Sequence, residues 1–272
     1  MLAKQGTAYY VPHGSHWRIV GSVGLFSLMI GASSWLNEAA FGKYLFLVGV
    51  AILVTMMAGW FGNVISESIR GFYNKQVDTS FRMGMIWFIF SEVMFFAAFF
   101  GALWYTRALV VPWLGGDGDG AATHSLLWTG FDGAWPTNGP ADVGGDFQLI
   151  PAWGLPLINT LILLTSGVTI TMAHHALKAN ARNGLLWWLG ATVLLGAVFL
   201  GLQAEEYVQA YQELNLTLGS GIYGSTFFML TGFHGLHVMV GAIMLYALLT
   251  RSLLDINVLH DRNPVAVKLS DG

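Results

Sequence analysis

The sequence contains no cysteine and little charge, and both absences narrow what the protein can be. Without a thiol among its 272 residues, the chain can form no disulfide, no zinc–thiolate site and no cysteine-ligated iron–sulfur cluster. Charged residues make up 10% of the chain, against about 25% in soluble domains, which is too little to cover a water-facing surface. The net charge of −3 argues against a nucleic-acid-binding surface. The composition therefore excludes an ordinary soluble domain and a nucleic-acid partner.

Long apolar runs take the place of the missing charge. Hydrophobic residues make up 55% of the chain, and the mean hydropathy is +0.59. A hydrocarbon core of ~30 Å requires roughly 20 helical residues, and the runs show no alternation typical of a membrane barrel. Backbone groups in lipid must be satisfied within each segment, which favours helices. The sequence predicts an all-α, polytopic transmembrane helical bundle in a single membrane domain, with six spans near residues 17–36, 44–65, 83–108, 156–177, 184–208 and 220–250.

The basic residues predict the orientation of the bundle. With the N-terminus inside, ten of the 12 Lys and Arg residues fall on the inner side. Only Lys43 and Arg107 fall outside. We expect a Gly- and Asp-rich outer loop at 109–155 and an inner tail at 251–272, with the N-terminus on the cytoplasmic or matrix side.

Glu92 is the one charged residue in the stretch FIFSEVMFFAAFF and is predicted to lie near the middle of the third span. Its depth is roughly 13–14 Å from the inner boundary, where inserting a charge costs about 2.5–3.5 kcal/mol. We expect a buried carboxyl. Two roles remain open for it: a neutral group that hydrogen-bonds to a neighbouring helix, and a proton-linked group.

Four histidines lie in the predicted spans, in two pairs. His174 and His175 are near the inner end of the fourth span, and His234 and His237 are near the middle of the sixth. Residues three apart share a helix face, so the second pair could point the same way, and His234 has a depth similar to that of Glu92. We therefore expect a polar contact between Glu92 and His234. Haem or metal ligation is disfavoured because the two pairs lie at different depths and no third ligand is near the second pair.

Further polar residues are expected at the ends of the spans. Interface candidates besides His174 and His175 are Glu205, Glu206 and Tyr207, at the outer end of the fifth span. Glu67, just past the second span, is a possible anchor for a lipid head group together with Arg70. Trp60, one of the aromatic residues typical of membrane interfaces, is a further candidate for the lipid cleft or its polar network, as are His234 and His237.

The residues alone leave three functional classes to weigh. A proton-coupled secondary transporter would use Glu92 as its coupling site, but such transporters usually show internal repeats and broken helices, and we find neither in the sequence. A di-haem cytochrome would need the histidine pairs to meet. A non-catalytic membrane subunit needs neither feature.

Four stretches resemble subunit III of the haem–copper cytochrome c oxidases. They are GMIWFIFSEVMFF, PLINTLILLTSGVTITMAHHAL, GLQAEEY and YGSTFFMLTGFHGLHVMVGA, in family order, and the likeness covers roughly residues 12–250. The two spans that precede the SEVMFF helix resemble the cytochrome c branch rather than the quinol branch.

The resemblance implies a subunit without haem or copper, which lie in partner subunits I and II. It implies that the first two helices and the remaining group flank a lipid-binding cleft, with phospholipid near Glu67 and the helix that carries His234 and His237. It further implies packing on subunit I, support of proton uptake and of turnover stability, and contact with cytochrome c only through the complex. The expected membrane is the bacterial or mitochondrial inner membrane.

The end of the chain differs from the family pattern. The family has a seventh, Trp-rich span, whereas this sequence ends RSLLDINVLHDRNPVAVKLSDG. We therefore expect six spans here, with the last helix of the family absent.

Overall fold

The structure is a computed structural model that describes residues 14–254. The predicted tail beyond residue 254, and with it the expectation of a missing seventh helix, lies outside the described residues. Six helices of the described part are long and apolar enough to cross a membrane, which confirms the predicted polytopic all-α architecture. They are α1 (Trp17–Leu36), α2 (Gly42–Ile69), α3 (Lys75–Tyr105), α6 (Leu155–Lys178), α7 (Arg182–Gln212) and α8 (Gly221–Leu254).

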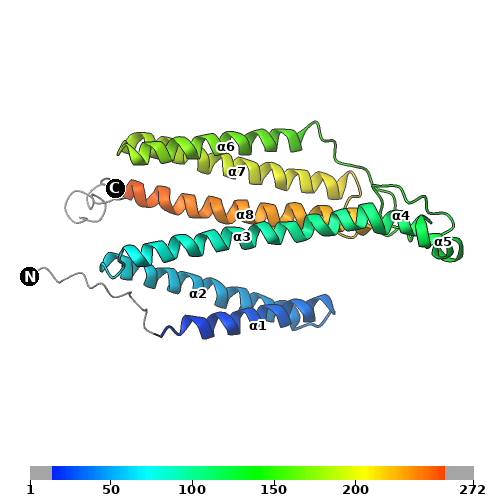
Figure 1. The fold of residues 1–272 in the computed structure, drawn as a ribbon, viewed down its shortest axis with the longest axis horizontal. Coiled ribbons are helices and arrows are strands. Elements are labelled where there is room, and N and C mark those ends of the chain that lie inside the picture. The colour runs from blue at the N-terminus through cyan, green and yellow to red at the C-terminus, as the bar shows by residue number, and fades with distance from the viewer. Residues whose placement is uncertain (1–13, 255–272) are drawn as a thin grey trace, which may run out of the picture. The chain divides into compact units, whose positions relative to one another are not determined.

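The chain divides into two compact units, and the division falls within α3, between Val93 and Met94. The first unit contains the α1–α2 hairpin, in which the two helices run side by side (Figure 1). Glycines let them approach closely: a Cβ atom at Gly31 would collide with the backbone of Phe46, and one at Gly49 with the backbone of Leu28. Both glycines are buried, and small residues of this kind allow membrane helices to pack backbone to backbone.

The third helix begins earlier than the hydropathy pattern predicts. Its first residue is Lys75, whereas the apolar run starts near 83. The side chain of Asn74 accepts a hydrogen bond from the amide of Val77 at 3.0 Å, which satisfies an otherwise free donor of the first turn. Asp78 then pairs with Arg82 one turn on, Nε to Oδ2 at 2.9 Å. This polar first stretch is helical because of local capping and pairing, which an apolar-run criterion does not detect.

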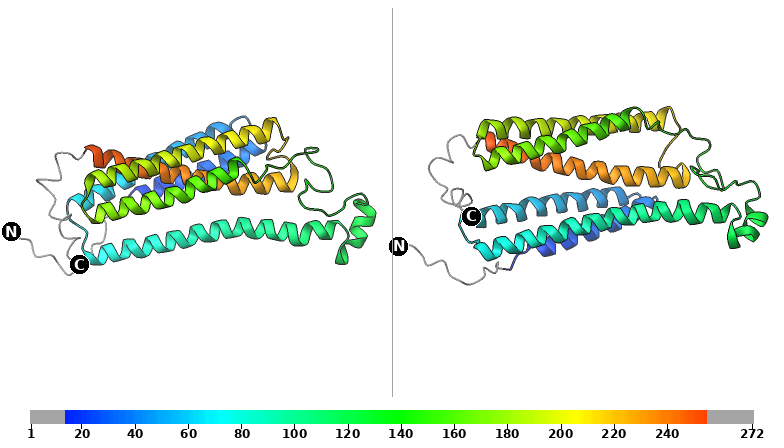
Figure 2. Two further views of the ribbon diagram at one scale, coloured as in Figure 1. Left: turned by 90° about the horizontal axis from the view of Figure 1, so that it is seen from above. Right: turned by 45° about the horizontal axis from the view of Figure 1, so that its top comes forward.

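The helical segment that begins with α3 also continues past the predicted end of the span at residue 108. A π-helical turn, Thr106–Val110, joins α3 to α4 (Val111–Leu114), so that residues 75–114 form one candidate span of 40 residues (Figure 2). A 3₁₀ turn at Gly118–Gly120 and α5 (Ala121–Leu127) follow. The segment expected as an outer loop therefore begins with helical structure.

The rest of that loop packs against the connection between α7 and α8. The amide nitrogen of Asn215 donates to the carbonyls of Gly144 (3.1 Å) and Asp146 (2.9 Å). The backbone N–H of Gln148 donates to the carbonyl of Leu214 at 2.9 Å. Phe147 and Ile150 of the loop also pack against the buried apolar cluster of Ala210, Leu216 and Phe228. The loop is thus held by the side-chain amide of Asn215, a backbone hydrogen bond and an apolar contact rather than being solely solvated.

Helices α6, α7 and α8 form the helical body of the second unit (Figures 1 and 2). A buried contact between the hydroxyls of Thr169 and Thr192, 2.8 Å apart, joins α6 to α7. The guanidinium of Arg182, at the start of α7, donates to the carbonyl of Ser252 near the end of α8 at 3.0 Å. One turn beyond Thr192, Gly196 of α7 faces Ala242 of α8, which keeps these two helices close.

The glycine contact in the first unit gives a stability prediction. Gly49→Ala forces a Cβ atom into the backbone of α1 and should lower the free energy of unfolding by about 1–3 kcal/mol. Gly62→Ala, on the same helix, is the matched control because its Cβ would meet open space. SDS-induced unfolding in mild detergent, followed by tryptophan fluorescence, compares the midpoints. Equal midpoints for the two variants would show that the hairpin does not depend on this close approach.

Candidate functional site

The end of α2 carries a carboxylate held by a neighbouring hydroxyl. Glu67 is half-buried, and its Oε2 accepts a hydrogen bond from the hydroxyl of Tyr73 at 2.8 Å. The ring of Tyr73 in turn packs edge to face against Phe81, with centroids 5.1 Å apart. Helix α2, the turn after it and the start of α3 therefore position this carboxylate together.

Two other predicted lipid contacts, one on α2 and one just after it, are exposed. Trp60 stacks on Phe61 with ring centroids 5.9 Å apart, and about half of its surface is free. Arg70, immediately after α2, is exposed. Trp60 and Glu67 are separated by two helical turns and so share one side of α2. Their assignment to a lipid site stays a prediction.

Glu92 lies in the last turn of the first unit and is half-buried in the isolated chain. Phe95 and Phe96 follow it by three and four residues, which places their rings on the same face of the continuous helix α3. Both rings belong to the second unit, where they contact α8. The contact that the sequence suggests between Glu92 and His234 stays a prediction.

The two histidines of α8 contact different helices, although three residues separate them. His234 packs edge-on against Phe199 of α7, with centroids 5.6 Å apart. His237 packs against Phe96 of α3 at 5.1 Å. The Nδ1 atom of His237 lies 2.6 Å from the carbonyl oxygen of Phe233, and because a carbonyl can only accept, Nδ1 is the donor. The two histidines thus pack against two different helices and do not form one shared site.

The histidines of α6 lie near its C-terminal end. His174 and His175 are both exposed, and their rings are 6.4 Å apart. In the part of the chain that the structure describes, no group of three or more His, Asp or Glu side chains is arranged to hold a metal ion.

The two adjacent acids near the end of α7 differ in solvent exposure. Glu205 is exposed, whereas Glu206 is only 9% exposed. The neighbouring Tyr207 turns toward α8, where its hydroxyl lies 2.7 Å from that of Thr231. The amide of Gln203 reaches the backbone carbonyl of Thr231 at 3.5 Å. This short stretch therefore presents one acid outward, buries the other and bonds to α8 through Tyr207.

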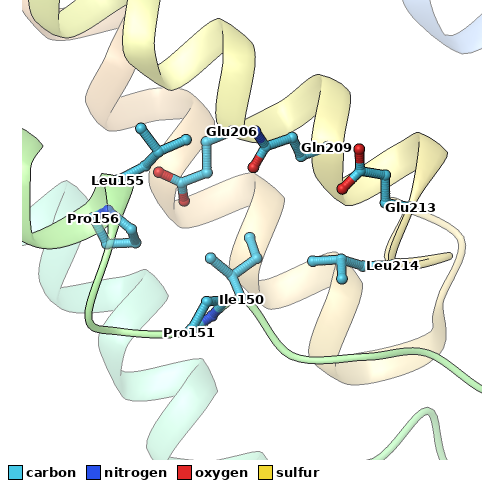
Figure 3. A pocket seen from close by; sticks show the side chains of 8 residues that line it. All are labelled: Ile150, Pro151, Leu155, Pro156, Glu206, Gln209, Glu213 and Leu214. Carbon is cyan, nitrogen blue, oxygen red and sulfur yellow. The ribbon is translucent and has the colours of Figure 1, made fainter.

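Glu206 borders a cavity of about 220 Å³ between the end of α7 and the segment that leads into α6 (Figure 3). Apolar side chains, among them Ile150 and Leu155, form part of its wall. Gln209, in the last turn of α7, and Glu213, just after the helix, line it further. The site thus combines two carboxyl groups and an amide with an apolar wall.

Several residues of these contacts escaped the sequence interpretation. The hydroxyl of Tyr73 bonds to Glu67, and that of Thr231 contacts Tyr207. The hydroxyls of Thr169 and Thr192 contact one another. Asn159 is buried in α6, and its side-chain oxygen has no hydrogen-bond partner among the described residues. The available signal was a hydroxyl or amide inside an apolar run, but threonine also bonds to its own helix, as Thr231 does to the carbonyl of Phe227 at 2.7 Å.

Comparison with known proteins gives a consistent set of relatives. The family model described as cytochrome c oxidase subunit III matches residues 7–118 and 125–261. The cytochrome c oxidase subunit 3 of Triticum aestivum is 37% identical over 246 residues, which are 90% of this chain and 82% of that protein. The subunit of Squalus acanthias is 36% identical over 253 residues, 93% and 85% of the two chains. That of Pongo abelii is 38% identical over 256 residues, 93% and 86%.

The link between α7 and α8 can be tested by removing one hydroxyl. Tyr207→Phe deletes the bond to Thr231 and should lower the free energy of unfolding by about 0.6–1.5 kcal/mol, the range for hydrogen bonds between membrane helices. Tyr246→Phe, at an exposed position of α8, is the control and should leave stability unchanged. SDS-induced unfolding of both variants measures the difference. A loss no larger for Tyr207→Phe than for the control would contradict a stabilising role of this bond.

Proposed function

Since the chain belongs to the cytochrome c oxidase subunit III family, we propose that it is the non-catalytic subunit III of an aerobic respiratory oxidase. In this role it packs on subunit I, binds phospholipid, and supports proton uptake and turnover stability. The observation that carries the proposal is the extent of the family match, which runs through all six candidate spans.

The redox centres are proposed to lie in the partner subunits. The chain has no cysteine, and its described histidines and carboxylates form no group of three or more with metal-ligand geometry. Subunits I and II would hold the haem and copper that transfer electrons from cytochrome c to oxygen. This chain would then contact cytochrome c only indirectly, through the complex.

The proposed phospholipid contacts lie at the end of α2. Arg70 is exposed where the helix ends, and an exposed guanidinium there can pair with a lipid phosphate. Trp60 presents about half of its surface, which suits contact with an acyl chain at the interface. Glu67, fixed by Tyr73, would accept hydrogen bonds from the head group.

The proposed support of proton uptake rests on the same end of the protein. The segment 66–82 carries Glu67, Arg70, Lys75, Asp78 and Arg82, and the distribution of basic residues predicts that it lies on the inner side. Titratable and charged groups at the mouth of a proton pathway retain protons and ordered water near the entrance. The chain would thus assist the proton supply of subunit I without itself being the pump.

A visible difference spectrum tests membership of a working oxidase. The tagged chain is purified from its own membranes in mild detergent, and a reduced-minus-oxidised spectrum should show a-type haem. A harsher detergent that strips the partner subunits should remove the signal. Absence of haem in both preparations would contradict assembly with the oxidase and call for a flux assay of the transporter alternative. Haem that stayed with the isolated chain would overturn the assignment of the redox centres to the partners.

The role of Glu92 is tested by two substitutions of similar size. If the carboxyl serves as a neutral hydrogen-bonding group, Glu92→Gln keeps a donor and should leave the free energy of unfolding nearly unchanged. Glu92→Leu removes the donor and should cost about 1–3 kcal/mol, because its partner is left unsatisfied. Unfolding midpoints and oxidase turnover are measured for both. Equal damage from Gln and Leu would assign Glu92 a proton-linked role instead.

A further inference from the structure

The carboxyl group of Glu206, beside the cavity, lacks a partner among the described residues, which indicates a site for a ligand. The side chain of Glu206 is nine-tenths buried and lies within the ring of residues that line the cavity (Figure 3). Among residues 14–254, neither of its carboxylate oxygens has a hydrogen-bond or ion-pair partner. The carboxylate oxygens face the cavity, whose walls are largely apolar, so a cation that enters the cavity would stabilise an ionised Glu206, and no described residue of the walls supplies one.

The polar groups of the cavity all favour a cation. Gln209 and Glu213 follow Glu206 by three and seven residues and therefore lie along the same side of the end of α7. They add an amide oxygen and a second carboxylate. None of the residues that line the cavity is Lys, Arg or His. A cationic group placed here would meet two acids and no competing positive charge from the walls.

The shape and the walls indicate which kind of cation fits. At about 220 Å³ the cavity is smaller than the ~300–1,000 Å³ of typical small-molecule sites, which suits one inserted side chain. Ile150, Leu155, Pro156 and Leu214 provide apolar surface for an aliphatic stem. Lysine combines a four-carbon stem with a compact ammonium group that has three donors.

We propose that this cavity receives a lysine side chain from a partner subunit, with its ammonium group bonded to Glu206 and its stem against the apolar wall. The proposal rests on the proposed function, since it requires the assembled oxidase. An aminophospholipid offers the same ammonium group but is less suited. Its phosphate would lie within reach of Glu213, and no basic residue of the walls would neutralise it.

Zero-length coupling in the purified complex tests the proposal. A water-soluble carbodiimide activates a carboxylate, and an adjacent lysine amine then forms an amide as the urea leaves. Peptide mass spectrometry should find Glu206 joined to a lysine of another subunit. Glu206→Gln should abolish this cross-link. Glu205→Gln removes the same charge from the exposed neighbouring position and should retain it.

The other outcomes overturn the proposal in distinguishable ways. Coupling of Glu206 to an aminophospholipid would assign the site to lipid. Coupling of Glu206 only to an added small amine, or a cross-link lost in Glu205→Gln but kept in Glu206→Gln, would show that no partner lysine occupies the cavity. The complex is first checked for a-type haem. If haem co-purifies and the cross-link is absent, only the lysine site fails, whereas loss of haem from the preparation contradicts the proposed function.

Discussion

A polar group inside an apolar helix is stabilised by a partner within the protein, because lipid offers none, and this constraint accounts for the hydroxyl contacts among α6, α7 and α8. The hydroxyls of Thr169 and Thr192 meet between α6 and α7, and those of Tyr207 and Thr231 meet between α7 and α8. Each contact joins two helices that otherwise present similar apolar surfaces to one another. The few polar side chains in the spans thus help to decide which helix lies beside which.

Glycine provides the complementary constraint in the first unit. Without a hydrophobic driving force between helices in lipid, association depends on close packing. Gly31 and Gly49 allow α1 and α2 to approach to backbone contact, and any side chain at either position would separate them. Close backbone packing therefore stabilises the hairpin. The second unit combines such a close approach, at Gly196, with hydroxyl contacts between its helices.

Glu206 differs from these bonded polar residues because its carboxyl group has no hydrogen-bond partner in the described part of the chain. Glu67 has the hydroxyl of Tyr73, but the carboxylate of Glu206 lies beside a cavity with no partner in the described part of the chain. A membrane subunit that works inside a larger complex has surfaces completed by its neighbours. A carboxyl group that faces a cavity with an apolar wall offers such a neighbour a place to bind.

The helical architecture was predictable from the sequence because hydropathy over some 20 residues decides whether a segment can cross a membrane. All six spans were found in this way, and the family followed from stretches such as GLQAEEY. The early start of α3 was not predicted, because it depends on the capping by Asn74 and on the Asp78–Arg82 pair rather than on hydropathy.

The partners of individual polar residues were decided only by the tertiary structure. His234 and His237 share a spacing that suggested one direction, yet they pack against α7 and α3 respectively. Glu205 and Glu206 are adjacent and chemically identical, and only the segment that leads into α6 buries one of them. The sequence by itself determined that the chain crosses the membrane and which family it belongs to. The packing of the helices decided which of its few polar groups meet, because a contact depends on rotation and register that hydropathy does not encode.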